Sequence, residues 1–192
     1  MACGTITRGS VIDECEDIPP GGTRARLLLA NIDDIEGFTE DVDNQITAIT
    51  FAGGAGFYEF TGFRNDVKKS EEVIKPEIGI PKFKHNVGWV IYENTQVQKN
   101  NIENIVRGRF VAVVENKGKD ENSFEVVGRA VGLEIVAGPI RNAHENGGFF
   151  VISLSTPDDQ GELEGQLPQT LFVSPDYAAT LAYLETLVIA ES

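Results

Sequence analysis

The sequence predicts a mainly β (α+β) domain with two packed β-sheets, or a partly closed β-barrel or sandwich, one flanking helix and a C-terminal helix. Short runs rich in Val, Ile and Phe recur between turns. Twenty glycines in 192 residues supply many of those turns. Helix-start signals stand out near Thr95 and Ser174, each followed by apolar residues at helical spacing.

The expected organisation is an N-terminal extended arm, residues 1–22, followed by a single β-rich domain, residues 23–192. A chain of 192 residues is long enough to bury a full core. Residues 19–22 read Pro-Pro-Gly-Gly, which continues neither a helix nor a central strand, so the arm should end there.

The first half of the domain predicts three strands. Residues 24–30 read as a strand, and the acidic stretch 31–44 reads as a connection. Residues 46–51 and 56–63 flank the glycine-rich 53–56, which predicts a hairpin turn between them.

Residues 64–85 are the most unusual segment. They are highly charged with alternating sign, and they contain Pro76 and Pro81. A central strand would not tolerate both prolines. We therefore expect a long charged loop or exposed hairpin, too poor in large apolar groups to fold onto its own core and able to reach a neighbouring subunit.

Residues 87–92 predict a buried strand, and a helix should follow over 95–107. Thr95 and Gln98 match a capping box, in which two side chains satisfy free amide groups. Gly108 stands where a left-handed residue would end the helix. The residues expected on one apolar face are Val97, Ile102, Ile105 and Val106.

The remaining chain predicts four more short strands and a second helix. The polar turn 116–122 should connect the first two of the strands 109–115, 123–128, 132–137 and 148–155. The helix is expected over 175–188, capped by Ser174 with Pro175 at its first position. Its expected apolar stripe contains Tyr177, Leu181, Leu184 and Val188.

The charge balance bears on the possible partners. Thirty acidic against sixteen basic residues give a net charge of -14, which repels phosphates and argues against binding nucleic acid.

No run approaches the roughly 20 apolar residues of a membrane span. Residues 1–4 lack the features of a secretory signal, so we expect none. Cys3 and Cys15 are expected to be reduced and partly buried, although one disulfide between them stays open.

Candidate catalytic and metal sites are weak, so we expect no enzyme, cofactor or metal. The glycine-rich 53–56 lacks the Lys-Ser/Thr of a phosphate-binding loop, and Ser153 and Ser155 lack a nucleophile-elbow frame. His85 and His144, even joined by the two cysteines, show no zinc-ligand spacing. Calcium at the acidic turns stays open, although their spacing is not that of an EF-hand. The acidic residues in question are Asp33, Asp34, Glu36, Glu40, Asp41, Asp43, Asp158, Asp159 and Glu162.

The order of elements resembles that of bacteriophage tail tube proteins. The most similar stretch is 87–155, with VGWVIYENTQVQKNNIENIVRGRFVAVVENKG, FEVVGRAVGLEIVAGP and GGFFVISLSTP. The opening around Cys3, Cys15 and PPGGTRARLLLANIDDIEGF resembles structural proteins from phages of Bacteroidota hosts. The C-terminal helix departs from that family's pattern.

The resemblance implies a virion protein assembled in the host cytoplasm. Its copies would form rings, commonly hexameric, that stack around a channel through which DNA passes without specific binding, alongside other virion proteins. Residues 1–22 and 64–85 match the segments that join one ring to the next. The charges expected to pair between subunits, or merely to keep the segment solvated, are Lys68, Lys69, Glu71, Glu72, Lys75 and Glu77.

Three alternatives remain open. One alternative is another virion component, such as a neck, tail-completion or capsid-associated protein. A β-sandwich module binding carbohydrate or protein would need exposed aromatic residues on one face. A hydrolase on a β scaffold would need acidic residues converging in a pocket.

Overall fold

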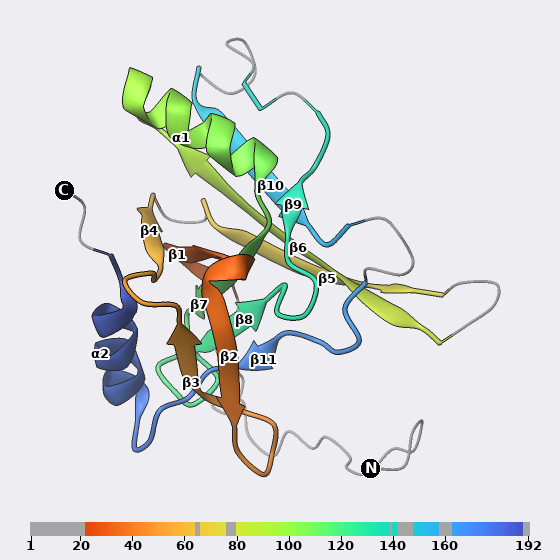
Figure 1. Ribbon diagram of the computed structural model, residues 1–192, viewed down its shortest axis with the longest axis vertical. Coiled ribbons are helices and arrows are strands. Elements are labelled where there is room, and N and C mark those ends of the chain that lie inside the picture. The colour runs from red at the N-terminus through yellow and green to blue at the C-terminus, as the bar shows by residue number, and fades with distance from the viewer. Residues whose placement is uncertain are drawn as a thin grey trace.

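The computed structural model describes residues 22–63, 66–75, 80–138, 140–141, 148–157 and 163–189. Within these residues the chain is mainly β, with three antiparallel sheets and two helices, as predicted (Figure 1). The sheets do not close into a barrel, which settles that alternative in favour of packed layers.

The five-stranded sheet is the middle layer. Its strand order is β11-β8-β7-β1-β4. The strands are β1 (Thr23–Asn31), β4 (Tyr58–Thr61), β7 (Phe110–Asn116), β8 (Phe124–Val127) and β11 (Gln169–Thr170). The apolar run from Leu27 to Ala30 is buried throughout because alternate side chains enter two different cores. β7 divides its side chains in the same way.

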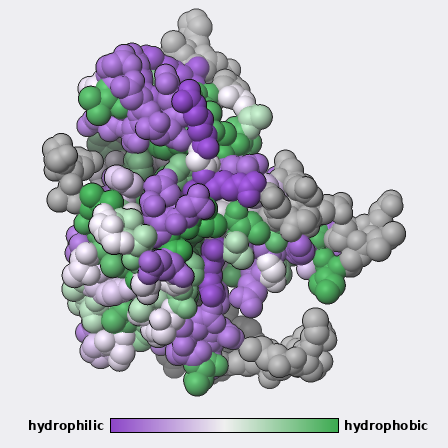
Figure 2. All heavy atoms as spheres, viewed as in Figure 1, coloured by the Kyte–Doolittle hydropathy of each residue, from purple (hydrophilic) through white to green (hydrophobic). Residues whose placement is uncertain are grey.

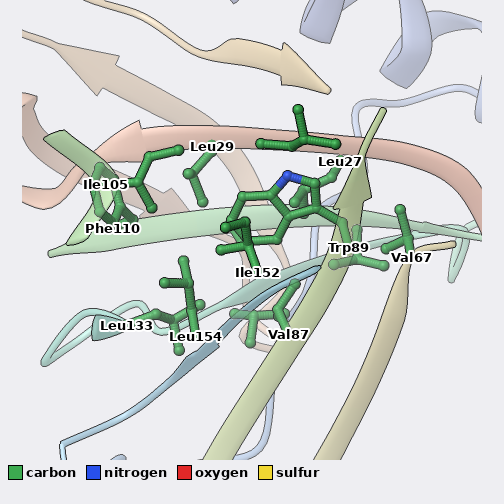
Figure 3. Packing of buried hydrophobic residues seen from close by; sticks show 14 of the residues in the cluster. Leu27, Leu29, Val67, Val87, Trp89, Ile105, Phe110, Leu133, Ile152 and Leu154 are labelled. Carbon is green, nitrogen blue, oxygen red and sulfur yellow. The ribbon is translucent and has the colours of Figure 1, made fainter. Parts of the chain in front are cut away.

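The first core lies between the middle sheet and a four-stranded sheet of order β5-β6-β10-β9. Those strands are β5 (Lys68–Ile74), β6 (Lys82–Ile91), β9 (Glu134–Ile135) and β10 (Phe150–Ser155). Figure 3 shows Trp89 of β6 and Ile152 of β10 facing Leu27 and Leu29 of β1. Helix α1 (Gln96–Arg107) closes this core with Ile102 and Ile105.

The second core lies on the opposite face of the middle sheet. It is covered by β2 (Ile35–Glu40), β3 (Ile46–Phe51) and helix α2 (Tyr177–Leu187). The Tyr183 hydroxyl of α2 accepts from the Ile49 amide at 2.7 Å and donates to the Ile49 carbonyl at 3.1 Å. These two bonds hold the helix against β3.

Helix α1 confirms its predicted start. The Thr95 hydroxyl accepts from the Gln98 amide at 3.2 Å. The Gln98 side chain donates to Glu93 instead of completing the capping box. Gly108 has an extended φ of -101°, so the expected left-handed end is wrong. Val97 is 76% exposed and does not join the apolar face.

Helix α2 starts two residues later than predicted. Its cap is Asp176, whose carboxylate accepts from the Ala179 amide at 2.8 Å, instead of Ser174. A carboxylate at this position also favours the positive end of the helix dipole. The predicted apolar stripe is confirmed, because all four of its residues belong to the second core.

Two expectations for the first half are wrong. The connection 31–44 contains a single 3-10 turn, Ile32–Asp34, and the whole of β2. The strands on either side of 53–56 do not pair with each other, since β3 pairs with β2 and β4 pairs with β1. The glycines therefore join two sheets. Gly56 is needed for space, because a Cβ there would lie 2.4 Å from the Leu187 carbonyl oxygen.

The described residues of the segment 64–85 are mostly strand, so they form a hairpin, as one of the two alternatives expected, instead of a long loop. β5 pairs antiparallel with β6 from Lys68 opposite Gly88 to Ile74 opposite Lys82. Pro81 directly precedes β6 and thus removes no hydrogen bond from its interior. The segment also reaches its own core, because Val67 and His85 are buried. Figure 1 shows the hairpin extending beyond the other strands.

Some predictions concern residues outside the described part of the chain. They include the arm 1–21, Cys3, Cys15, Pro76, Glu77, His144 and the acidic turn 158–162. Among the described residues, neither helix is long and apolar enough to cross a membrane.

Candidate functional site

A pocket of about 650 Å³ opens where β2, β6 and β8 meet the segment 163–167. Four titratable side chains line this pocket, so we examine it as a candidate catalytic or binding site. The polar residues that line it are Glu40, His85, Arg129, Glu164, Gln166 and Gln169.

His85 reaches this pocket because β6 alternates inward and outward side chains. It is 2% exposed. Its Nδ1 accepts from the Gly128 amide at 3.3 Å, so the ring is neutral with its proton on Nε2, which donates to the Gln166 carbonyl at 3.0 Å. Burial lowers the pKa of His85, and the nearby charge of Glu164 acts in the opposite direction.

Glu164 lies beside His85 and is 4% exposed. Its Oε1 accepts from the Ala130 amide at 2.9 Å and from the Val131 amide at 3.2 Å. Its own backbone exchanges two hydrogen bonds with Phe83 of β6. The carboxylate therefore holds the turn after β8 against the four-stranded sheet.

Arg129 covers the outer part of the pocket. Its guanidinium pairs with Glu40, hydrogen-bonds Gln169 and lies 5.0 Å from the centre of the Phe38 ring. General acid–base catalysis needs a group able to exchange a proton with a substrate. Both ring nitrogens of His85 are instead hydrogen-bonded to main-chain groups of Gly128 and Gln166. The histidine therefore connects β6, the turn after β8 and the segment 163–167.

The acidic residues of the first half serve turns and ion pairs. The Asp41 carboxylate accepts from the amides of Asp43 and Gln45, each at 2.9 Å. Asp34 accepts from Asn31 at 2.8 Å. No group of three or more possible metal ligands exists within the described ranges.

The residues proposed for assembly divide between two faces of β5. Lys69 points inward, where its ammonium pairs with Glu71 at 3.1 Å and with Glu125 of β8. Lys68 and Glu72 are exposed on the outer face. Lys75 is exposed after the strand ends, and Glu77 lies outside the described residues.

An exposed aromatic cluster was not predicted. Tyr92 contacts Phe63 and Phe149, with ring centres 4.9 and 4.6 Å apart. Its hydroxyl donates to Asp66 at 2.8 Å, and this bond raises the pKa of Tyr92. Phe63 is 70% exposed. A pocket of about 400 Å³ beside the cluster is lined by residues 59–63, 90–93 and 98. Each ring follows or precedes a strand, so no periodic pattern marks it.

A buried ion pair was also missed. Glu115 of β7 accepts from the Tyr177 hydroxyl at 2.6 Å and pairs with Arg24 Nε at 2.8 Å. Burial, followed by Glu115, raises the pKa of Tyr177 to about 12. The ion pair lies within the middle sheet, and the Tyr177 hydrogen bond joins α2 to that sheet, which is a structural role.

No protein-family model, curated protein or solved structure matches this chain. The functional argument therefore depends on the geometry and charge described above.

Proposed function

We propose that this chain is a non-enzymatic structural protein of a virion. Its copies assemble into rings that stack as a bacteriophage tail tube, with an acidic channel for DNA. The observation that carries the proposal is the β5–β6 hairpin, which extends beyond the sheets and carries exposed charges of both signs on β5 (Figure 1). A projecting hairpin of this kind fits a contact between subunits better than a contact within one.

The charge of the chain supports passage of DNA without binding. Each copy carries -14, and a wall of this sign repels phosphates. Acidic residues of 33–43 are largely exposed, including Asp33, Glu36, Asp41 and Asp43. Figure 2 shows hydrophilic side chains over α1, whereas the rest of this face mixes hydrophilic and hydrophobic side chains.

The hydrogen bonds of His85 and Glu164 to the main chain also support a structural role. In the pocket around His85, the imidazole and the buried Glu164 carboxylate hold main-chain amides and a carbonyl. These groups stabilise the packing of the layers.

The test is the assembly state of the purified protein. Sedimentation velocity at increasing concentration and negative-stain electron microscopy should show rings or tubes with a central channel. Rings that never stack would favour a neck or tail-completion protein. Particles of one copy or two at every concentration, with no rings, would contradict the proposal.

A second function is favoured by the aromatic cluster. Aromatic faces beside carboxylates are typical of sugar-binding surfaces, and Glu59 and Glu93 lie by the pocket. If the chain is a β-sandwich module that binds sugars, adding oligosaccharides should quench or shift the fluorescence of the protein. Replacing Phe63 with Ala should abolish that change, whereas replacing the distant exposed Val42 with Ala should not.

A further inference from the structure

Strand β5 is the longest free edge among the described strands. It pairs with β6 on one side, and its other side ends the four-stranded sheet. The edges formed by β9 and β11 are two residues long, that of β4 is four, and those of β2 and β3 in the two-stranded sheet are six. β5 has seven residues. Free edges of this length are available for pairing with another strand.

The charges of β5 reverse about its centre. Residues 68–72 read Lys-Lys-Ser-Glu-Glu, with Val67 before them and Val73 after them. Ser70 is the midpoint. In an antiparallel pair of two copies with Ser70 opposite Ser70, every lysine therefore faces a glutamate of the other copy.

This register is selected against its neighbours. A centre at Lys69 places two lysines opposite each other, and a centre at Glu71 places two glutamates opposite each other. A shift of one residue pairs inward-facing with outward-facing side chains, which an antiparallel ladder does not allow. A parallel pair in register opposes like charges at each charged position.

The outer-face charges are available for such a pair. Lys68 and Glu72 are exposed, and neither side chain makes an ion pair or hydrogen bond with another residue in the described part of the chain. Lys69 is different, because its ammonium already pairs with Glu71 and Glu125 of its own chain. Selectivity between registers would thus come mainly from two symmetric contacts between Lys68 and Glu72.

We propose that two copies of this chain associate through β5, antiparallel and centred on Ser70, to form a two-fold dimer with a continuous eight-stranded sheet. A two-fold contact is self-complementary, as this charge order requires. The contact is short, so the dimer should be concentration-dependent. The inference does not rest on the proposed tube, since it needs only two copies.

The test uses sedimentation equilibrium at about 0.15 M salt, where the Debye length of about 8 Å limits the long-range repulsion between two chains of -14. The unchanged protein should dimerise as its concentration rises. Lys68→Glu alone and Glu72→Lys alone each place like charges opposite each other twice, and should weaken the dimer about tenfold or more. The double variant restores opposite charges and should dimerise again.

Mixing supplies the most specific result. The K68E and E72K proteins, each a weaker dimer alone, should form a heterodimer when combined, because both outer contacts then join opposite charges. The matched control is Lys75→Glu, which changes the net charge as K68E does but lies outside residues 68–72. It should leave the dimer intact, and circular dichroism should show all variants folded.

Several outcomes would overturn the pairing: a monomer at every concentration, a double variant as weak as the single ones, or no heterodimer on mixing. Rings or tubes that are insensitive to K68E would leave the tube proposal standing and the pairing wrong. A dimer that is weakened by K68E, with no rings or tubes, would support the pairing and contradict the tube proposal.

Discussion

Tyr177→Phe tests the buried contact between α2 and the middle sheet. The change removes a 2.6 Å hydrogen bond from the Tyr177 hydroxyl to Glu115, which is 5% exposed. Hydrogen bonds to charged groups contribute about 1.5–3 kcal/mol. The Arg24 guanidinium remains 2.8 Å from the carboxylate, so the larger penalty of an unpaired buried charge should not arise. We expect the free energy of unfolding to fall by about 1.5–3 kcal/mol.

Urea denaturation measures this change, and the slope with denaturant should stay constant. A matched control is Tyr58→Phe, because Tyr58 is 51% exposed and should change stability by less than about 0.5 kcal/mol. Absorbance titration of the tyrosines provides a second readout. Glu115→Gln should lower the pKa of Tyr177 from about 12, although burial should keep it above 10. Equal effects of Tyr177→Phe and Tyr58→Phe, or an unchanged titration, would refute the assigned contact.

Three further outcomes follow from the packing. Burial lowers the pKa of His85 below 6.5, so the unfolded chain binds a proton that the folded chain does not. The free energy of unfolding should decrease as the pH falls below about 6.5, by at most about 1.4 kcal/mol per pH unit. Gly56→Ala should destabilise the fold by about 1–3 kcal/mol because its Cβ meets the α2 backbone, whereas Gly53→Ala, with nothing within 4 Å, should not. Ile152→Ala should cost about 2–5 kcal/mol through the cavity it leaves in the first core.

Each of these is checked by denaturation of the folded variants. His85→Gln has no titratable ring, so it should lose the slope between pH 6.5 and the lower pKa of the folded state. The same slope in that variant would mean that another group titrates. Ser153→Ala, on the exposed face beside Ile152, is the control for the cavity.

The sequence predicted the apolar strands and both helices because their signals are local. Residues 24–30 and 109–115 contain the continuous apolar runs 27–30 and 110–114, which is the pattern of strands buried on both faces. The Thr95 cap and the stripe of α2 likewise depend on neighbours in sequence. Strand pairing could not be predicted from the same signals, since β3 joins β2 through a turn within 31–44 that was read as a plain connection.

The period-2 pattern of β6 contained more information than was used. Phe83, His85, Val87, Trp89 and Ile91 alternate with outward residues, so the strand and the inward position of His85 were predictable. The density of charge around them favoured a loop instead. The partners of His85 were not predictable, because they are main-chain groups brought together by contacts distant in sequence.

The buried carboxylates and hydroxyls of the described chain already have partners, although Trp89 Nε1 in the first core has none, and this directs the search for function to the surface. Glu164 holds two amides, and Glu115 holds a hydroxyl and a guanidinium. The Thr180 hydroxyl accepts from the Val173 amide and faces two carbonyls. If one of these groups bound a ligand instead, its present hydrogen-bond partner would be left buried and unpaired. Charged groups without a partner in the described chain, such as Lys68 and Glu72, lie instead on the open edge of a sheet, where a second copy can reach them.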